Sequence, residues 1–439
     1  MERRTGVTPA REEGLEEARA GARPTHGLRI ALVGLNYLPE PTGIAPYTTG
    51  VARGLAALGH EVSVVTGMPH YPAWKRHPDY PGVVRHEDDG GVDVTRVWHP
   101  VPRNPLGAGR VGLEAGFALG AAAALTHHRR TRPRPDVVVA VSPALLSVAA
   151  ALAHGRAVRA PVGVVVQDVY SRTAVSTDAG GGTALRVAAE LEGRLLRRAT
   201  GVALAHERFR RPVTALGVPA DNLTVLPNWT HVTRADPAAG DAVRARRGWD
   251  TRTPVVLHAG NMGAKQHLEN VLDTARLAAD SGLPHRFVLL GDGARRRALQ
   301  ARAGDLANVE FIDPVSDEEF PAHLAAADVL LLNEVPGLHD MCAPSKLTSY
   351  FAAGRPVLAA THDDSAAAAE LATSRAGLRV DPARPEDLLT GLQRLREHPD
   401  LAADLAAAGP RYAAEQLAAG PAITAYDRWI RDIGDTPWN

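Results

Sequence analysis

The sequence has little of what several large classes of protein require. Its 439 residues include one cysteine, so no disulfide can form within the chain, and this usage fits a reducing compartment. Lysine and arginine together number 49, as do aspartate and glutamate, which leaves a formal net charge of zero. Because there is no basic excess, the composition gives no sign of a nucleic-acid partner.

Long apolar segments are missing too. The longest apolar stretch, residues 111–126, is shorter than the ~20 residues that a membrane-spanning helix needs, and it contains Glu114. Residues 1–27 are charged and lack the apolar core of a secretory signal peptide, so we expect a mobile tail there. These features predict a cytoplasmic protein.

The motifs of several kinds of catalysis are absent as well. The chain has no Asp-x-Asp triplet and no spacing of histidine and cysteine that would indicate a zinc site. It also lacks the G-x-S-x-G pattern of α/β-hydrolases and the H-E-x-x-H pattern of metalloproteases. We therefore expect neither a metal nor a cofactor.

What the chain does have is a regular alternation of short apolar segments with helical patterns. Several of these segments, such as residues 136–142 and 161–167, are unbroken apolar runs, as expected for parallel strands covered on both faces. The alternation predicts doubly wound α/β sheets. The segments are too many for one such sheet, and the polar stretch 228–254 is the best boundary. We expect two Rossmann-like domains facing a cleft, at residues 28–232 and 240–420.

In open α/β sheets, ligands bind in the loops that follow the carboxyl ends of the strands. The loop after the first predicted strand contains Gly43, which would let the backbone approach a ligand closely. A loop in the second domain holds Gly291 and Gly293, which resemble half of a dinucleotide fingerprint. Asp168 directly follows a strand and could orient a substrate hydroxyl or accept a proton. The alternative for each is an ordinary turn or cap.

The first loop of the second domain places Asn261, Lys265 and Gln266 before a helix. The free N–H groups and the dipole of a helix amino terminus favour an anion, and a lysine there adds a full positive charge. The loop does not have the spacing of a nucleotide-binding Walker loop. The alternative is a plain turn between a strand and a helix.

A second helix start, at residues 345–353, has a similar character. Ser345 and Ser349 lie opposite the apolar residues of this predicted helix, and Lys346 lies between the two sides. The helix would offer hydroxyls, a cation and free N–H donors to a ligand, although a capped surface helix is the alternative. Together, the two helix starts at Lys265 and Lys346 predict a ligand that bears a diphosphate.

The motifs along residues 28–435 resemble those of the family 4 glycosyltransferases, most of all the branch of colanic-acid and capsule biosynthesis. They are, in order, "NYLPEPTGIAPYTTGVARGLAALGHEVSVVTGMPHYP", "VQDVY", "LPNW", "HAGNMGAKQHLENVL", "LGDG" and "DMCAPSKLTSYFAAGRPVLA". The resemblance implies the GT-B fold, with the last helix, 421–435, returning to the first domain. It also implies retaining transfer of a sugar from a UDP- or GDP-linked donor to a hydroxyl acceptor, without a required metal.

By the same resemblance, Lys265 would contact the diphosphate of the donor and Gly43 would lie near it. We expect Lys265, Asp168 and Asp340 to be the catalytic residues. The residues expected to bind the nucleotide-sugar are Gly43, Asn261, Gln266, Gly291, Gly293, Ser345, Lys346 and Ser349.

The sequence departs from the family pattern in several places. Many members have two glutamates where this chain has Met341 and Ser349, and Asp340 is one residue from the first of these positions. Many also have an arginine in the region of Asn261, and some have a histidine near the position of Ser142. These departures leave the sugar of the donor open.

Several functions therefore stay open beside the transfer of a sugar into a polysaccharide or glycoconjugate. The chain could act on a small-molecule acceptor, or it could bind a nucleotide-sugar without transfer. An epimerase should show additional carboxylates for proton abstraction, which we do not find. Residues 111–135, apolar and then basic, predict contact with the inner face of a membrane and a lipid-linked acceptor. The alternative is a buried helix followed by a solvated loop.

Overall fold

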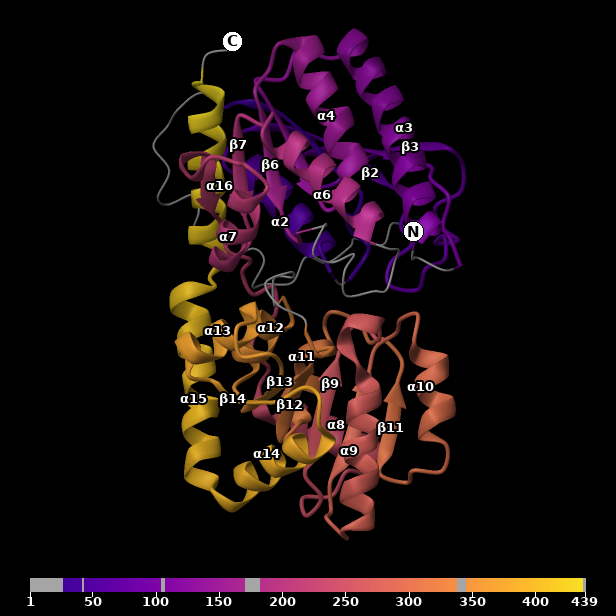
Figure 1. Ribbon diagram of the computed structural model, residues 1–439, viewed down its shortest axis with the longest axis vertical. Helices are drawn as coiled ribbons and strands as arrows, with labels where there is room; N and C mark the ends of the chain where they lie inside the picture. The colour runs from indigo at the N-terminus through magenta and orange to yellow at the C-terminus, as the bar shows by residue number, and fades with distance from the viewer. Residues whose placement is uncertain (1–26, 42, 104–106, 170–181, 338–344, 437–439) are drawn as a thin grey trace. The chain divides into compact units, whose positions relative to one another are not determined.

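The computed structural model describes residues 27–41, 43–103, 107–169, 182–337 and 345–436 (Figure 1). These residues form two compact units. The N-terminal unit holds the described residues from Gly27 to Asn228 and from Ala419 to Thr436, and the C-terminal unit holds those from Trp229 to Ala418. Among the helices described, none is both long and apolar enough to cross a membrane.

The N-terminal unit is built on an eight-stranded sheet with the order β3-β4-β2-β1-β5-β6-β7-β8. All neighbours pair in parallel except β3, which runs antiparallel to β4. The strands are β1 (Arg29–Gly34), β2 (Glu61–Gly67), β3 (Val84–Asp88), β4 (Val92–Val97), β5 (Val137–Ser142), β6 (Val162–Val166), β7 (Gly201–Leu204) and β8 (Leu223–Val225). Six α-helices of the unit are α2 (Ala45–Ala57), α3 (Gly107–Thr131), α4 (Leu145–Val158), α6 (Gly182–Leu196), α7 (Arg210–Ala215) and α16 (Ala419–Gly434).

Helices cover both faces of this sheet. The valine-rich β5 and β6 are buried along their whole length, as predicted for strands covered on both sides. Helices α3, α4 and α7 share one core with them, while α2 and α16 lie on the opposite face. On that face, Gly163 and Gly201 leave room for the side chains of Trp429 and Ile433 from α16. The apolar residues expected on the buried face of this helix, Ile423, Tyr426, Ile430 and Ile433, are all buried.

The C-terminal unit is built on a six-stranded parallel sheet with the order β11-β10-β9-β12-β13-β14. Its strands are β9 (Val255–Ala259), β10 (Arg286–Leu290), β11 (Val309–Ile312), β12 (Val329–Asn333), β13 (Val357–Ala360) and β14 (Gly377–Val380). Its α-helices include α8 (Pro237–Arg247), α9 (Leu268–Asp280), α10 (Arg296–Ala303), α11 (Phe320–Ala326), α12 (Ser345–Ala353), α13 (Ala366–Ser374), α14 (Pro385–Glu397) and α15 (Pro399–Gln416). Helices α9, α10 and α14 pack on one face and α8, α11, α12 and α13 on the other, while α15 contributes to both cores.

The order of the strands marks one point in each sheet where a ligand is expected. In the C-terminal unit the chain winds outward from β9 through β10 to β11, and then returns to β12 beside β9 before it winds the other way. The N-terminal unit has the same reversal between β1 and β5. Helices that follow adjacent strands at such a switch point lie on opposite faces, which leaves a crevice at the carboxyl ends of the strands.

Candidate functional site

The loop that carries Lys265 follows β9, at the switch point of the C-terminal unit. A single 3-10 turn (Ala264–Gln266) leads from Gly263 into α9. The side-chain oxygen of Gln266 accepts the backbone N–H of Gly263 at 3.0 Å, so this side chain folds back on its own loop. Gln266, predicted to bind the donor, therefore also shapes the turn in which the half-buried Lys265 lies.

The same loop is fastened to the end of β12. Asn333, the last residue of that strand, donates its side-chain amide to the carbonyl oxygens of Gln266 at 3.0 Å and His267 at 2.9 Å. The backbone N–H of Val335 donates to the carbonyl of Lys265 at 2.9 Å. These bonds join the loops of the two strands at the switch point, so the position of Lys265 is set by the framework of the sheet.

A third loop, the turn after β10, packs directly on the loop of Lys265. The N–H of Gly260 donates to Leu290 at 2.8 Å, and the N–H of Met262 donates to Asp292, also at 2.8 Å. Gly291 has a φ of 134°, and a side-chain carbon at this position would lie 2.1 Å from the carbonyl oxygen of Gly260. Only glycine fits such an approach of two backbones. Gly291 was predicted to line a nucleotide site, and the structure shows it as the point where the two loops meet.

Lys346 lies near the start of α12, but its ammonium group is turned inward. It donates to the carbonyl of Ala259 at 2.7 Å, directly beneath Gly260. Burial lowers the pKa of Lys346 to about 7, and the nearby Glu334 acts in the opposite direction. Burial raises the pKa of Glu334 to about 7, against the effects of the Thr361 hydroxyl and of the two lysines, Lys265 and Lys346. This pairing with the end of β9 was not predicted.

The rest of α12 follows the prediction in part. Its apolar residues Leu347, Tyr350 and Phe351 are buried, as expected. The hydroxyl of Tyr350 also accepts the N–H of Ala259 at 2.9 Å, which ties α12 to β9. Ser349, expected to face a ligand, is only 5% exposed, whereas Ser345 is half-buried. Asp340, Met341 and Cys342 lie outside the residues that the structure describes.

The remaining predicted residues belong to the N-terminal unit. Gly43 has a φ of 73° in the turn after β1, and a side-chain carbon there would lie 3.1 Å from the ring of Tyr71. Asp168 is half-buried and lies two residues after the end of β6, and its neighbour Gln167 accepts a hydrogen bond from Asn228 at 2.8 Å. Both predicted residues thus lie at the carboxyl edge of their sheet, in a different unit from Lys265.

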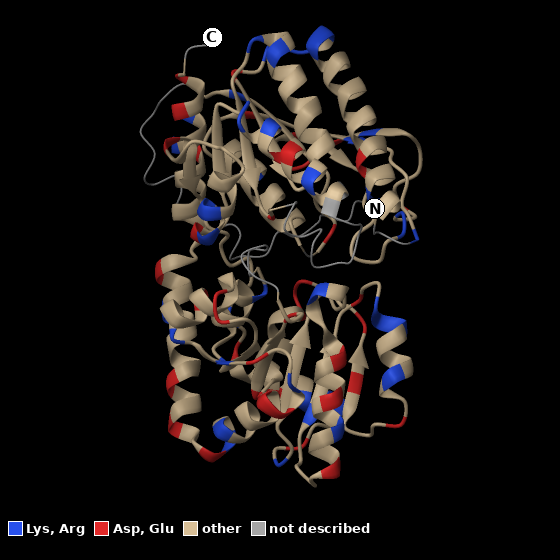
Figure 2. Cartoon of the chain, in the orientation of Figure 1, with Lys and Arg blue, Asp and Glu red and all other residues tan. Residues whose placement is uncertain are grey.

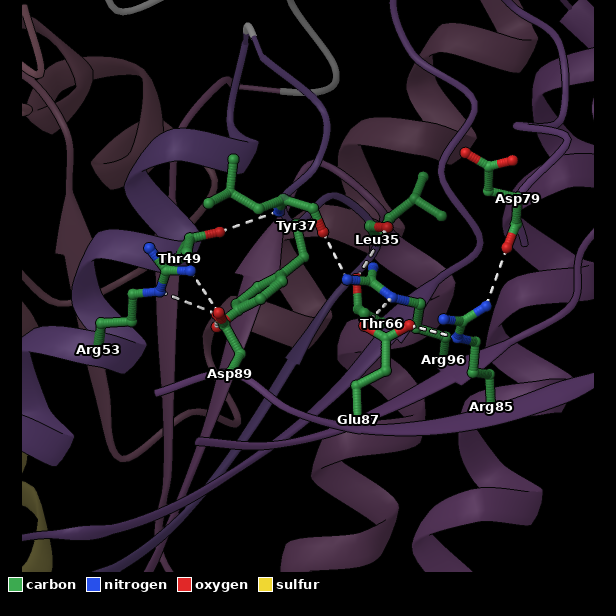
Figure 3. A network of polar contacts seen from close by, with 11 residues as sticks. Leu35, Tyr37, Thr49, Arg53, Thr66, Asp79, Arg85, Glu87, Asp89 and Arg96 are labelled. Atoms are coloured by element: carbon green, nitrogen blue, oxygen red, sulfur yellow. Dashed lines mark hydrogen bonds and ion pairs between the residues drawn. The ribbon is translucent and has the colours of Figure 1, made fainter. Parts of the chain in front are cut away.

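Polar contacts that the sequence did not suggest hold the loop after β1 (Figure 3). Arg96 of β4 donates to the carbonyl of Leu38 at 2.5 Å and to Glu87 at 3.0 Å. Tyr37 donates its hydroxyl to Asp89 at 2.8 Å, and the same carboxylate accepts from Arg53. An arginine within the predicted strand was the only signal for this network, and pattern alone does not show what such a residue binds.

The buried carboxylate of Glu40 fixes the other end of that loop. It accepts the backbone N–H groups of His70 at 2.8 Å and Tyr71 at 2.9 Å, and the side chain of Asn36 at 2.7 Å. Burial would raise the pKa of Glu40, but the bonds from His70 and Asn36 outweigh it and keep this pKa below its usual value. The turn that carries Gly43 is therefore anchored on both sides.

Among the described residues, one group could together ligate a metal ion, namely His362, Asp363 and Asp364 after β13. The two aspartates are exposed, and exposed acidic groups of this kind are common on protein surfaces. The group carries no catalytic assignment here.

Comparison with known proteins decides the family. Residues 42–229 match the family described as "Glycosyl transferase 4-like domain", and residues 241–412 match "Glycosyl transferases group 1". The chain belongs to the family 4 glycosyltransferases. It is 30% identical over 335 residues to the colanic acid biosynthesis glycosyl transferase WcaI of Escherichia coli (strain K12), covering 74% of this chain and 82% of WcaI. The predicted family is thereby confirmed.

Other relatives and several solved structures are similar to this glycosyltransferase over most of its length. The 2-deoxystreptamine glucosyltransferase of Streptomyces kanamyceticus is 25% identical over 392 residues, covering 86% of this chain and 97% of that protein. Among solved structures, Alr3699/HepE of Anabaena in complex with UDP has a TM-score of 0.67 at 14% identity, covering 92% and 100% of the two chains. WaaG, a glycosyltransferase of lipopolysaccharide biosynthesis, has a TM-score of 0.66 at 18% identity, covering 93% and 100%. These likenesses confirm the predicted fold of two Rossmann-like domains.

Proposed function

We propose that this glycosyltransferase moves a sugar from a UDP- or GDP-linked donor to a hydroxyl acceptor in the synthesis of cell-surface polysaccharide or glycoconjugate. The observation that carries the proposal is the position of Lys265, which hydrogen bonds to β12 fix at the switch point of the C-terminal unit. The similarity to WcaI supports a role in polysaccharide synthesis. The fold shared with HepE, whose structures contain UDP and UDP-glucose, supports a donor of this class.

The proposed reaction retains the configuration of the sugar and requires no metal ion. As the bond between sugar and phosphate breaks, negative charge grows on the departing diphosphate. Lys265 and the amino end of α9 stabilise that charge, and a single well-placed group of this kind contributes about 3 kcal/mol to such a transition state. The leaving phosphate takes the proton of the acceptor hydroxyl on the same face of the sugar, and Asp168 orients the acceptor. A catalytic role for Asp340, which lies outside the described residues, stays a prediction.

A panel of donors tests this function directly. UDP-, GDP- and dTDP-sugars are each added to the full chain at about 100 times the expected Kd, with and without a chelator. We expect a UDP- or GDP-sugar to stabilise the protein by ~2.7 kcal/mol at that excess, which raises the midpoint of thermal unfolding by roughly 5–10 °C. The chelator should leave the shift unchanged. If none of the three classes shifts the midpoint, the proposed site is wrong.

We propose in addition that α3 rests on an anionic membrane surface, where a lipid-linked acceptor would be reachable. Val111 and Leu119 of α3 are 54% and 74% exposed, and Val84 on the edge strand β3 is 53% exposed. Val84 pairs with Val97, and Val97 packs on Gly120 of α3, so the edge strand lies beside this helix. Basic residues gather at the carboxyl end of α3, while most of the helix bears no charge (Figure 2). The opposite side of α3 is buried, as in the alternative prediction, but the basic residues 127–130 belong to the helix and not to a loop after it.

Sedimentation with vesicles tests this contact. Leu119→Glu is expected to reduce binding to vesicles of phosphatidylcholine and phosphatidylglycerol by about tenfold, because it puts a negative charge into the apolar surface. Val187→Glu is the matched control, since Val187 is 64% exposed on α6 and lies apart from this surface in the sequence. Equal binding by both variants and the unaltered chain would contradict a role for α3.

A further inference from the structure

Glu334 is a charged residue for which neither the family resemblance nor the proposed reaction has a role. It is the first residue after β12, and its backbone N–H donates to the carbonyl of Ala360 at the end of β13, at 3.0 Å. The next residue, Val335, bonds to the carbonyl of Lys265. Glu334 therefore lies between the Lys265 loop and β13, at the carboxyl ends of the central strands where the donor is proposed to bind.

A chain of hydroxyl groups orients the carboxylate of Glu334. The hydroxyl of Thr361 donates to its Oε2 atom. Thr361 Oγ1 lies 2.7 Å from the hydroxyl oxygen of Ser365, which in turn accepts the N–H of Ala368 at 3.0 Å as the cap of α13. Thr361 and Ser365 are both buried. Because Thr361 has one proton and gives it to Glu334, Ser365 must donate to Thr361, so the direction of the whole chain is fixed.

The second oxygen of this carboxylate, Oε1, forms no hydrogen bond within the part of the chain that the structure describes, and Glu334 is half-buried. Lys265 and Lys346 lie close enough to affect the charge of Glu334. A carboxylate near a diphosphate site repels the diphosphate, so a compensating contact with another part of the donor is the natural reason for its presence.

We propose that Glu334 selects the donor sugar, with Oε1 accepting a hydrogen bond from a hydroxyl of the sugar that is transferred. A hydroxyl-to-carboxylate bond is among the stronger hydrogen bonds in proteins, and the hydroxyl chain through Thr361 holds the acceptor in place before the donor arrives. This role rests on the proposed function, because it needs a nucleotide-sugar in the C-terminal unit. It differs from the predicted roles of Asp340 and Ser349.

The affinity for a nucleotide, compared with the affinity for the corresponding nucleotide-sugar, isolates this contact. Calorimetric titration gives the Kd of UDP, UDP-glucose, GDP and GDP-mannose for the full chain, and the informative quantity is the ratio of Kd values for a nucleotide and its sugar. Glu334→Gln is expected to lower the ratio of the nucleotide's Kd to the nucleotide-sugar's Kd about tenfold, because binding of the nucleotide-sugar weakens. The Kd of the nucleotide alone should change less than about threefold. The amide oxygen of the substituted side chain would stay on the Thr361 hydroxyl, so its NH2 group, which cannot accept a hydrogen bond, would face the sugar.

Two further variants keep the test decisive. Asp363→Asn removes an exposed carboxylate after the next strand and should leave the ratio unchanged. Thr361→Val keeps Glu334 but removes the hydroxyl that orients it, and it should lower the ratio by a few-fold even if Glu334→Gln does not fold. An unchanged ratio in folded Glu334→Gln overturns the inference alone. The inference is also overturned if Glu334→Gln binds nucleotide and nucleotide-sugar more tightly by the same factor. Glu334 would then only offset the positive charge of Lys265 and Lys346. If the unaltered chain binds none of the four compounds, the proposed function fails as well.

Discussion

Lys265→Ala is expected to lower the release of nucleoside diphosphate from a donor by about 100-fold or more at saturating donor. The loop of Lys265 is fixed to β12 by the side chain of Asn333, so the framework stays in place when the ammonium group is removed. What is lost is the countercharge for the departing diphosphate. The measurement is the rate of donor hydrolysis without acceptor, or of transfer once an acceptor is known.

Arg297→Ala is the matched control for this loss of positive charge. Arg297 is exposed on α10 of the same unit, and its replacement should have no effect on turnover beyond a factor of about two. If Lys265→Ala hydrolyses the donor as fast as the unaltered chain, the proposed stabilisation of charge is wrong. If the unaltered chain binds a donor tightly but never turns it over, the chain is a nucleotide-sugar-binding protein and not an active transferase.

The sequence allowed most of the framework to be predicted because the strands of parallel sheets have a strong local signal. The valine runs of β5 and β6 could be interpreted without knowledge of their neighbours. The edge strand β3 was not predicted, since Val84–Asp88 is polar, exposed and paired on one side only. Its pairing depends on β4, and a local pattern does not contain that information.

The sequence predicted those residues of the candidate site whose role depends on their own position in a loop. Gly291 and Lys265 could be found because a glycine directly after an apolar strand permits a close approach of the backbone, and a lysine at the start of a helix favours an anion. Asn333 and Glu334 were passed over, although each ends or follows an apolar strand in the same way. Their roles depend on partners far away in the sequence, such as Gln266 and Thr361. The inward turn of Lys346 was missed for the same reason.

Gly291→Ala is expected to destabilise the C-terminal unit by about 3 kcal/mol or more. The added methyl group would lie 2.1 Å from the carbonyl oxygen of Gly260, and the φ of 134° at Gly291 is unfavourable for alanine. The neighbouring atom belongs to a backbone that the sheet holds in place, so it cannot move away cheaply. In a unit of this size the midpoint of thermal unfolding should fall by roughly 10 °C, measured by calorimetry or circular dichroism.

Gly282→Ala separates the clash at Gly291 from the cost of an unusual backbone angle. Gly282 also has a positive φ, 64°, but no atom lies within 4 Å of the position that a methyl group would occupy. Its replacement should cost only about 1 kcal/mol. Equal destabilisation by the two variants would show that backbone strain dominates and that the β9 and β10 loops can separate. A much larger loss for Gly291→Ala, accompanied by loss of nucleotide binding, would show that the close approach of these loops both stabilises the unit and shapes the donor site.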